Sequence, residues 1–93
     1  MRLKWGIKPS TIDPATFKNA RYGLAIDEDE QPIKSWSYVI VRHDQSSRPY
    51  HVWVRIHGRT LAVMTAYATL KAAKTAALTD AGARWDIERA ESA

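Results

Sequence analysis

Residues 50–57 read Tyr-His-Val-Trp-Val-Arg-Ile-His, and this stretch decides the fold because two kinds of side chain alternate along it. Alternation over four to eight residues is typical of a β-strand with one buried face. Successive side chains of a strand point to opposite faces of its sheet. We expect one set in the core, namely Tyr50, Val52, Val54 and Ile56. The other set then forms the outer face, namely His51, Trp53, Arg55 and His57.

The preceding segment, residues 34–43, reads Lys-Ser-Trp-Ser-Tyr-Val-Ile-Val-Arg-His and predicts a second strand. A polar, turn-forming segment at residues 44–49 joins it to the first, so the two strands are predicted to form a hairpin. We favour a register in which Val39 and Val41 face the core. The outer face then gains Trp36, Tyr38, Ile40 and Arg42. The opposite register buries Trp36, Tyr38 and Ile40 and exposes the valines, since a shift of one residue exchanges the faces.

The first third of the chain predicts two more strands, because residues 2–8 and 21–26 also alternate. Between them, Asp13-Pro14 has the form of a helix start, with Asp as the N-cap and Pro at the first helical position. A short N-terminal helix ending near residue 20 is therefore expected. The four adjacent carboxylates of residues 27–30 repel one another and predict a solvated turn.

After a predicted tight turn at His57-Gly58-Arg59, residues 60–67 fit either a third hairpin strand or the start of a long helix. Their β-branched and aromatic residues favour the strand. A helix is then expected over residues 70–81, with Gly82 at its C-terminal end. Residues 84–88 alternate weakly and predict an edge strand, and residues 89–93 predict a frayed tail.

These elements predict one small α+β domain over residues 1–93. We expect an antiparallel sheet of four to five strands, one main C-terminal helix packed on one face of the sheet, and the short N-terminal helix. A chain of 93 residues can bury one modest core. Alanines recur along the predicted C-terminal helix, so this helix can lie close against the sheet.

The composition excludes several classes of protein. The chain has no cysteine, which excludes disulfides and thiolate metal sites. No apolar stretch approaches the roughly 20 residues that span a membrane, and no secretory leader is recognisable. We therefore expect a cytoplasmic protein without a membrane partner.

Catalytic and cofactor chemistry is not predicted either. His51 and His57 share a strand face but stand about 20 Å apart at ~3.3 Å per residue, and His43 supplies no third metal ligand. No preorganised Ser-His-acid set or glycine-rich phosphate loop is present. We predict a non-enzymatic protein with no catalytic residue, metal or cofactor.

The outer face of the hairpin predicts binding. The chain holds four Trp and four Tyr against one Phe, and its net charge of +4 favours anionic partners. Aromatic rings stack on bases, and arginines attract phosphates. We therefore predict a nucleic-acid-binding module, without a preference for DNA or RNA. The expected binding residues are Trp36, Tyr38, Arg42, His51, Trp53, Arg55, His57 and Arg59.

Two alternatives use the same face. The first is a protein-binding module, such as a phage-encoded inhibitor of the anti-CRISPR or another anti-defence type, which would block an acidic or nucleic-acid-handling protein sterically. The second is a homo-oligomer joined through this face.

The order of elements in residues 36–78 also resembles integrase arm-type and plant AP2-type DNA-binding domains. These have a three-stranded sheet followed by a helix, with a Gly-Arg strand start and an aromatic-x-Thr helix entry, here Gly58-Arg59 and Tyr67-Ala68-Thr69. The resemblance implies DNA recognition through the exposed side of the sheet by Arg42, Trp53, Arg55 and Arg59. Residues 1–33 lie outside it, and the third strand lacks the basic residues of the pattern.

Overall fold

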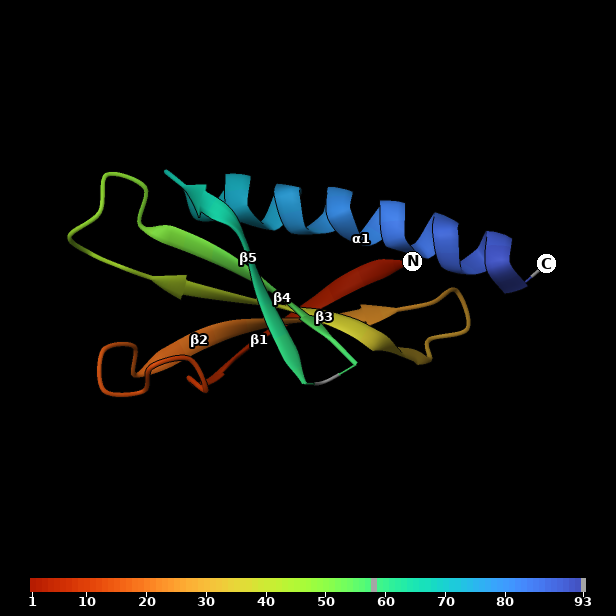
Figure 1. Cartoon of the computed structure of the whole chain (residues 1–93), viewed down its shortest axis with the longest axis horizontal. Helices are drawn as coiled ribbons and strands as arrows, with labels where there is room; N and C mark the ends of the chain where they lie inside the picture. The colour runs from red at the N-terminus through yellow and green to blue at the C-terminus, as the bar shows by residue number, and fades with distance from the viewer. Residues whose placement is uncertain (58, 93) are drawn as a thin grey trace.

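The computed structural model describes residues 1–57 and 59–92, which form five strands and one helix (Figure 1). The elements are β1 (Arg2–Pro9), β2 (Asn19–Ile26), β3 (Pro32–Arg42), β4 (Tyr50–Ile56), β5 (Thr60–Tyr67) and α1 (Leu70–Ser92). Gly58, the centre of the predicted tight turn, and Ala93, the end of the predicted tail, lie outside the described residues. The strands pair in chain order and are all antiparallel.

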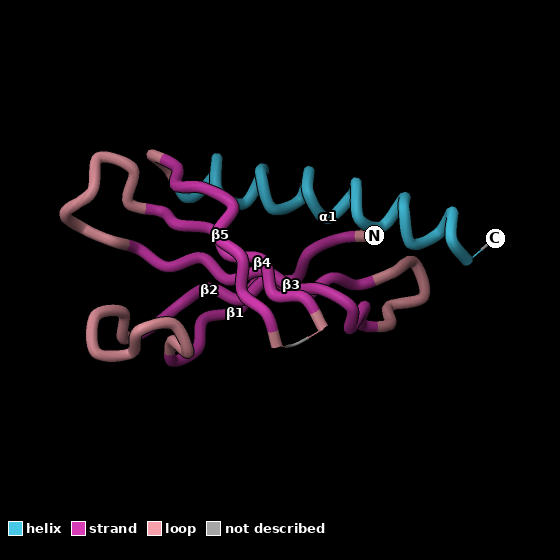
Figure 2. The backbone as a smooth tube through the Cα atoms, in the orientation of Figure 1, coloured by secondary structure: helices cyan, strands magenta, loops and turns pink. Residues whose placement is uncertain are grey.

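The small α+β domain with an antiparallel sheet and one C-terminal helix is confirmed. Residues 60–67 form a strand, as their β-branched side chains predict. Helix α1 lies along one side of the sheet (Figure 2). The loops between β1 and β2 and between β3 and β4 lie at one end of the molecule, and the loop between β2 and β3 lies at the other. We call the face under α1 the helix-side face and the other the open face. Among the described residues, no helix is both long and apolar enough to cross a membrane.

The main core lies between α1 and the helix-side face. Ala73, Ala77 and Ala81 are fully buried against the sheet. Their spacing of four residues places them on one side of the helix, and their small side chains allow a close approach. The sheet contributes buried residues of its three middle strands, namely Ala25, Ile33, Trp36, Tyr38, Ile40, Val52 and Val54.

Polar contacts fix the position of α1 on the sheet. The Tyr38 hydroxyl donates to the Asp80 carboxylate, and Arg84 Nε donates to Asp80 Oδ2 at 2.7 Å. Burial and the neighbouring Asp80 carboxylate raise the pKa of the Tyr38 hydroxyl above its ordinary value. One turn beyond Arg84 along α1, Trp36 Nε1 donates to Glu88 Oε2 at 3.2 Å.

The predicted N-terminal helix is not seen. Residues 10–18 instead form a loop with a turn at Asp13, whose φ of 39° differs from the extended conformation of an N-cap. Only four residues separate Pro14 from the start of β2, too few for a stable helix. The loop conformation also lets Ile12 and Phe17 pack on the open face.

Helix α1 is longer than predicted. It continues past Gly82 to Ser92, so the expected edge strand at residues 84–88 is wrong. The contact of Glu88 with Trp36 of the sheet and the packing of Trp85 against the core favour the helix over local alternation. The ion pair of Arg84 with Asp80, one turn earlier in the same helix, adds to this preference. Residues 89–92 form its last turn.

Candidate functional site

Register places the side chains of the open face in three rows that cross the sheet. One row contains Lys4 of β1, Leu24 of β2, Ser37 of β3 and Arg55 of β4. The next contains Tyr22, Val39, Trp53 and Val63. The third contains Lys8, Ala20, Val41 and His51. The open face therefore collects side chains from all five strands.

The loop of residues 10–18 covers one end of this face. Ile12 and Phe17 pack on a second apolar cluster that includes Ala20, Val39 and Val41. The loop is tied down by Tyr22, whose hydroxyl accepts from the backbone N–H of Thr11 at 2.9 Å and donates to the carbonyl of Pro9 at 3.1 Å. The open face is therefore covered near Val41 and uncovered toward Leu24.

His51 belongs to the covered end. Its ring stacks on that of His43, with 5.8 Å between the centroids and 13° between the planes. Phe17 meets the His43 ring edge-on at 6.0 Å. In the described part of the chain, no group of three or more His, Cys, Asp or Glu side chains is placed to hold a metal ion. The two histidines thus extend an aromatic cluster.

The uncovered part of the open face is apolar in the middle and basic at its sides. Leu24 is 45% exposed and Val63 is 57% exposed, and half-buried Trp53 pairs directly with Val63. We call this surface the open strip and define it by these three residues together with three cations, namely Lys4, Lys8 and Arg55. Lys4 and Lys8 are exposed on β1, and half-buried Arg55 lies on β4.

Charge is segregated between the strands and the other elements. None of the five strands contains an Asp or Glu among the described residues. Two carboxylates of the acidic turn at residues 27–30 form ion pairs with positive groups at the N-terminal end of the chain. The Met1 ammonium lies 3.3 Å from Glu28 Oε1, and Arg2 pairs with Glu30. A backbone hydrogen bond and then the Met1 ammonium lower the pKa of Glu28. The described residues of the strands that form the open strip carry no carboxylate, and the acidic turn pairs with Met1 and Arg2, so the open strip is basic.

The structure places three of the eight predicted binding residues on the open face. Trp53 and Arg55 belong to the open strip, and His51 belongs to the covered end. Trp36 and Tyr38 are predicted on the same outer face, and this register is wrong. They are 5% and 0% exposed on the helix-side face. The alternative register is the observed one because α1 covers Trp36 and Tyr38, while the loop of residues 10–18 covers the valines on the opposite face.

The other three predicted residues lie away from the open strip. Arg42 is exposed on the helix-side face, where its Nε lies 2.7 Å from Asp44 Oδ1 in an ion pair. His57 and Arg59 follow the end of β4, and both are exposed. His57 has a φ of 51°, and its backbone N–H donates to the Ser35 carbonyl at 2.6 Å.

Sequence reasoning missed four residues of the strip, namely Lys4, Lys8, Leu24 and Val63. The alternation in residues 2–8 does place both lysines on one side of their strand. Only the strand order shows that this side is continuous with Trp53 and Arg55.

Comparison with known proteins finds no matching family model, no similar curated protein and no similar solved structure. The order β3, β4, β5, α1 is the one that the resemblance to integrase arm-type domains implies. Arg42, however, lies on the opposite face from Trp53 and Arg55, so the residues implied by the resemblance do not form one surface.

Proposed function

We propose that this protein is a nucleic-acid-binding module that holds a single strand on the open strip. The observation that carries the proposal is the arrangement of Trp53 and Leu24 between cations on a sheet whose strands lack carboxylates among the described residues. Proteins that bind single strands combine a positively charged track with aromatic side chains on which bases stack.

The dimensions of the strip suit an extended polymer. Lys4 and Arg55 share a row and are separated by three strand spacings, about 14 Å at roughly 4.8 Å each. Lys4 and Lys8 are four residues apart on β1, about 13 Å at ~3.3 Å per residue. Three cations thus surround an apolar area that includes Trp53. A base can stack there while its flanking phosphates reach the cations.

A single strand suits this surface better than a duplex. Stacking on Trp53 requires a base with a free face, which a paired duplex does not offer without unstacking. Base stacking on an aromatic side chain contributes about 1–3 kcal/mol. Each phosphate neutralised on a single strand adds about −0.7 to the slope of log K against log salt concentration. With three cations engaged, we expect a slope of about −2.

Fluorescence anisotropy of a short labelled oligonucleotide tests this proposal. Lys4→Gln and Arg55→Gln should each weaken binding at low salt and reduce the magnitude of the slope by about 0.7. Arg48→Gln is the matched control, because Arg48 is an exposed cation of the loop between β3 and β4. Trp53→Ala should weaken binding by about five-fold or more at all salt concentrations. If all three variants bind as Arg48→Gln does, the open strip is not the site.

A protein partner is the second candidate, favoured by the exposed apolar side chains of Leu24 and Val63 beside Trp53. Aromatic and apolar residues inside a charged rim form the usual energetic centre of a protein interface. Such a partner would present acidic groups to Lys4, Lys8 and Arg55. A pull-down with and without nuclease separates the two candidates. Recovery of a partner that survives nuclease treatment supports the protein interface, and loss of all captured material supports nucleic acid.

A further inference from the structure

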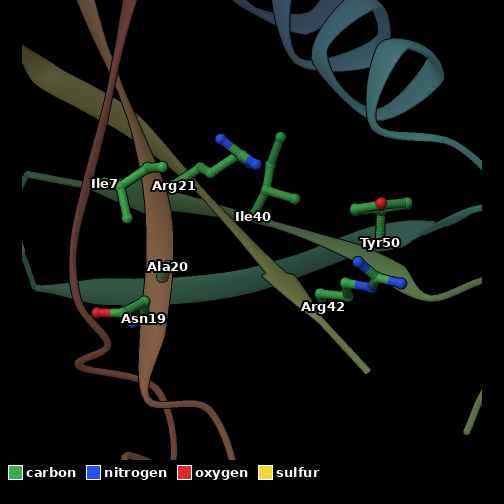
Figure 3. Close-up of a pocket in the computed structure, with 7 residues that line it drawn as sticks. All are labelled: Ile7, Asn19, Ala20, Arg21, Ile40, Arg42 and Tyr50. Carbon is green, nitrogen blue, oxygen red and sulfur yellow. The ribbon is translucent and has the colours of Figure 1, made fainter. Parts of the chain in front are cut away.

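A second basic site lies on the helix-side face, and none of the described residues that line it belongs to α1. It is a pocket of about 220 Å³ between the first four strands. The residues that line it are Ile7, Asn19, Ala20, Arg21, Ile40, Arg42 and Tyr50 (Figure 3). The open strip occupies the opposite face, so the pocket is separate from the proposed nucleic-acid site.

Two arginines give the pocket its charge. Arg21 of β2 pairs with Ile40 of β3, and Arg42 stands two residues further along β3. Diagonal neighbours of this kind are about 7–8 Å apart. Figure 3 shows Arg21 beside Ile40 and Arg42 beneath the Tyr50 ring. The two guanidinium groups therefore approach the pocket from neighbouring strands.

The positive charge of the pocket is only partly compensated. Arg42 pairs with Asp44 at the surface, where both side chains are mostly exposed, and its guanidinium carbon lies 5.8 Å from the centre of the Tyr50 ring. The side chain of Arg21 makes no hydrogen bond or ion pair with any residue that the structure describes. Guanidinium groups bind carboxylates and phosphates through paired hydrogen bonds. An anion placed between the arginines would receive donors from both.

Three of the other lining residues are apolar, namely Ile7, Ala20 and Ile40. Ile40 is buried in the sheet, whereas Ile7 is 63% exposed at the rim. An isoleucine this exposed next to two cations suits a ligand that has both an anionic group and an apolar body. The volume limits that body, because pockets for drug-sized ligands measure about 300–1,000 Å³. A ligand with one ring is the expected size.

We propose that this pocket binds a phosphate monoester carried on a single apolar or aromatic ring. The phosphate lies between Arg21 and Arg42, and the ring rests on Ile7 and Ile40. A dianionic phosphate suits two arginines better than a carboxylate, which carries one charge.

Isothermal titration calorimetry with phenyl phosphate tests the proposal. We expect saturable one-to-one binding to the wild type, weaker binding of benzoate, and weaker binding of inorganic phosphate, which lacks the ring. Arg21→Gln and Arg42→Gln should each reduce the affinity for phenyl phosphate about ten-fold or more. Lys18→Gln is the control, because Lys18 is exposed and does not line the pocket.

A variant at the rim tests the role of the apolar surface. Ile7→Ser should remove most of the preference for phenyl phosphate over inorganic phosphate and leave the affinity for inorganic phosphate unchanged. The proposal is overturned if phenyl phosphate gives no saturable binding, or if both arginine variants bind it as Lys18→Gln does. Equal affinities of the wild type for phenyl phosphate and benzoate would show that the pocket does not distinguish a phosphate from a carboxylate. This result would also overturn the proposal.

Discussion

Removal of the Tyr38 hydroxyl should destabilise the protein at neutral pH and should cease to matter in alkali. The hydroxyl is buried and donates to the Asp80 carboxylate. Hydrogen bonds to charged groups contribute about 1.5–3 kcal/mol. Asp80 keeps its bond from Arg84 in Tyr38→Phe, so the carboxylate is not left without a partner. We therefore expect the lower value, a loss of about 1.5 kcal/mol from the free energy of unfolding at pH 7.

The pH dependence follows from the direction of the pKa shift. Burial and Asp80 raise the pKa of Tyr38 in the folded state above the ordinary value of 10.0. The Tyr38 hydroxyl therefore contributes its full stabilisation below pH 10. Above pH 10, Tyr38 of the unfolded chain loses its proton, and the contribution to the free energy of unfolding falls. The fall approaches 1.36 kcal/mol per pH unit, so wild type and Tyr38→Phe should have nearly equal stability at about pH 11.

Urea unfolding followed by Trp fluorescence, at several pH values between 7 and 11, measures this difference directly. Thr79→Ala is the control, because its hydroxyl donates only to the Thr75 carbonyl of its own helix and does not titrate. This variant should stay within about 0.5 kcal/mol of wild type at every pH. A gap between Tyr38→Phe and wild type that stays constant up to pH 11, or that is absent at pH 7, would refute the reasoning.

Two further predictions concern close packing. Ala77→Leu should lower the free energy of unfolding by about 1–3 kcal/mol, because Ala77 is fully buried between α1 and the sheet, whereas exposed Ala72→Leu should have little effect in the same urea titration. A Cβ at Gly23 would lie 2.7 Å from the end of the Trp5 ring, so Gly23→Ala should displace Trp5 and cost about 1–2 kcal/mol. Gly6→Ala is its control, since a Cβ at Gly6 meets nothing within 4 Å. Equal stability of the two glycine variants, with an unchanged Trp emission maximum, would contradict this packing.

The local sequence patterns predict the positions of the five strands well, but they assign the two faces of β3 wrongly. Residues 50–57 alternate strictly, so their two faces are assigned correctly from parity. In β3, both faces are apolar, because α1 covers Trp36 and Tyr38 while the loop of residues 10–18 covers Val39 and Val41. Alternation cannot tell which of two apolar sets lies under the helix. The loop that would resolve the ambiguity is itself predicted as a helix from Asp13-Pro14.

The sites depend on contacts between distant parts of the chain. The open strip joins Lys4 of β1 to Arg55 of β4, and the pocket joins Arg21 to Arg42 across two strands. Strand order and register determine which of these residues are neighbours, and no local sequence motif predicts them. The length of α1 has the same origin, because contacts with the sheet keep residues beyond Gly82 helical.

The most direct test of the central claim is a chemical-shift map of the protein side chains during titration with a single-stranded oligonucleotide. We expect the methyl groups of Leu24 and Val63 and the indole N–H of Trp53 to shift together and to saturate at the same oligonucleotide concentration. The methyl groups of Leu78 and Ile87, which are exposed on α1, should not move. Shifts at Leu78 and Ile87 with Leu24, Val63 and Trp53 unchanged would show that the open strip is not the nucleic-acid surface.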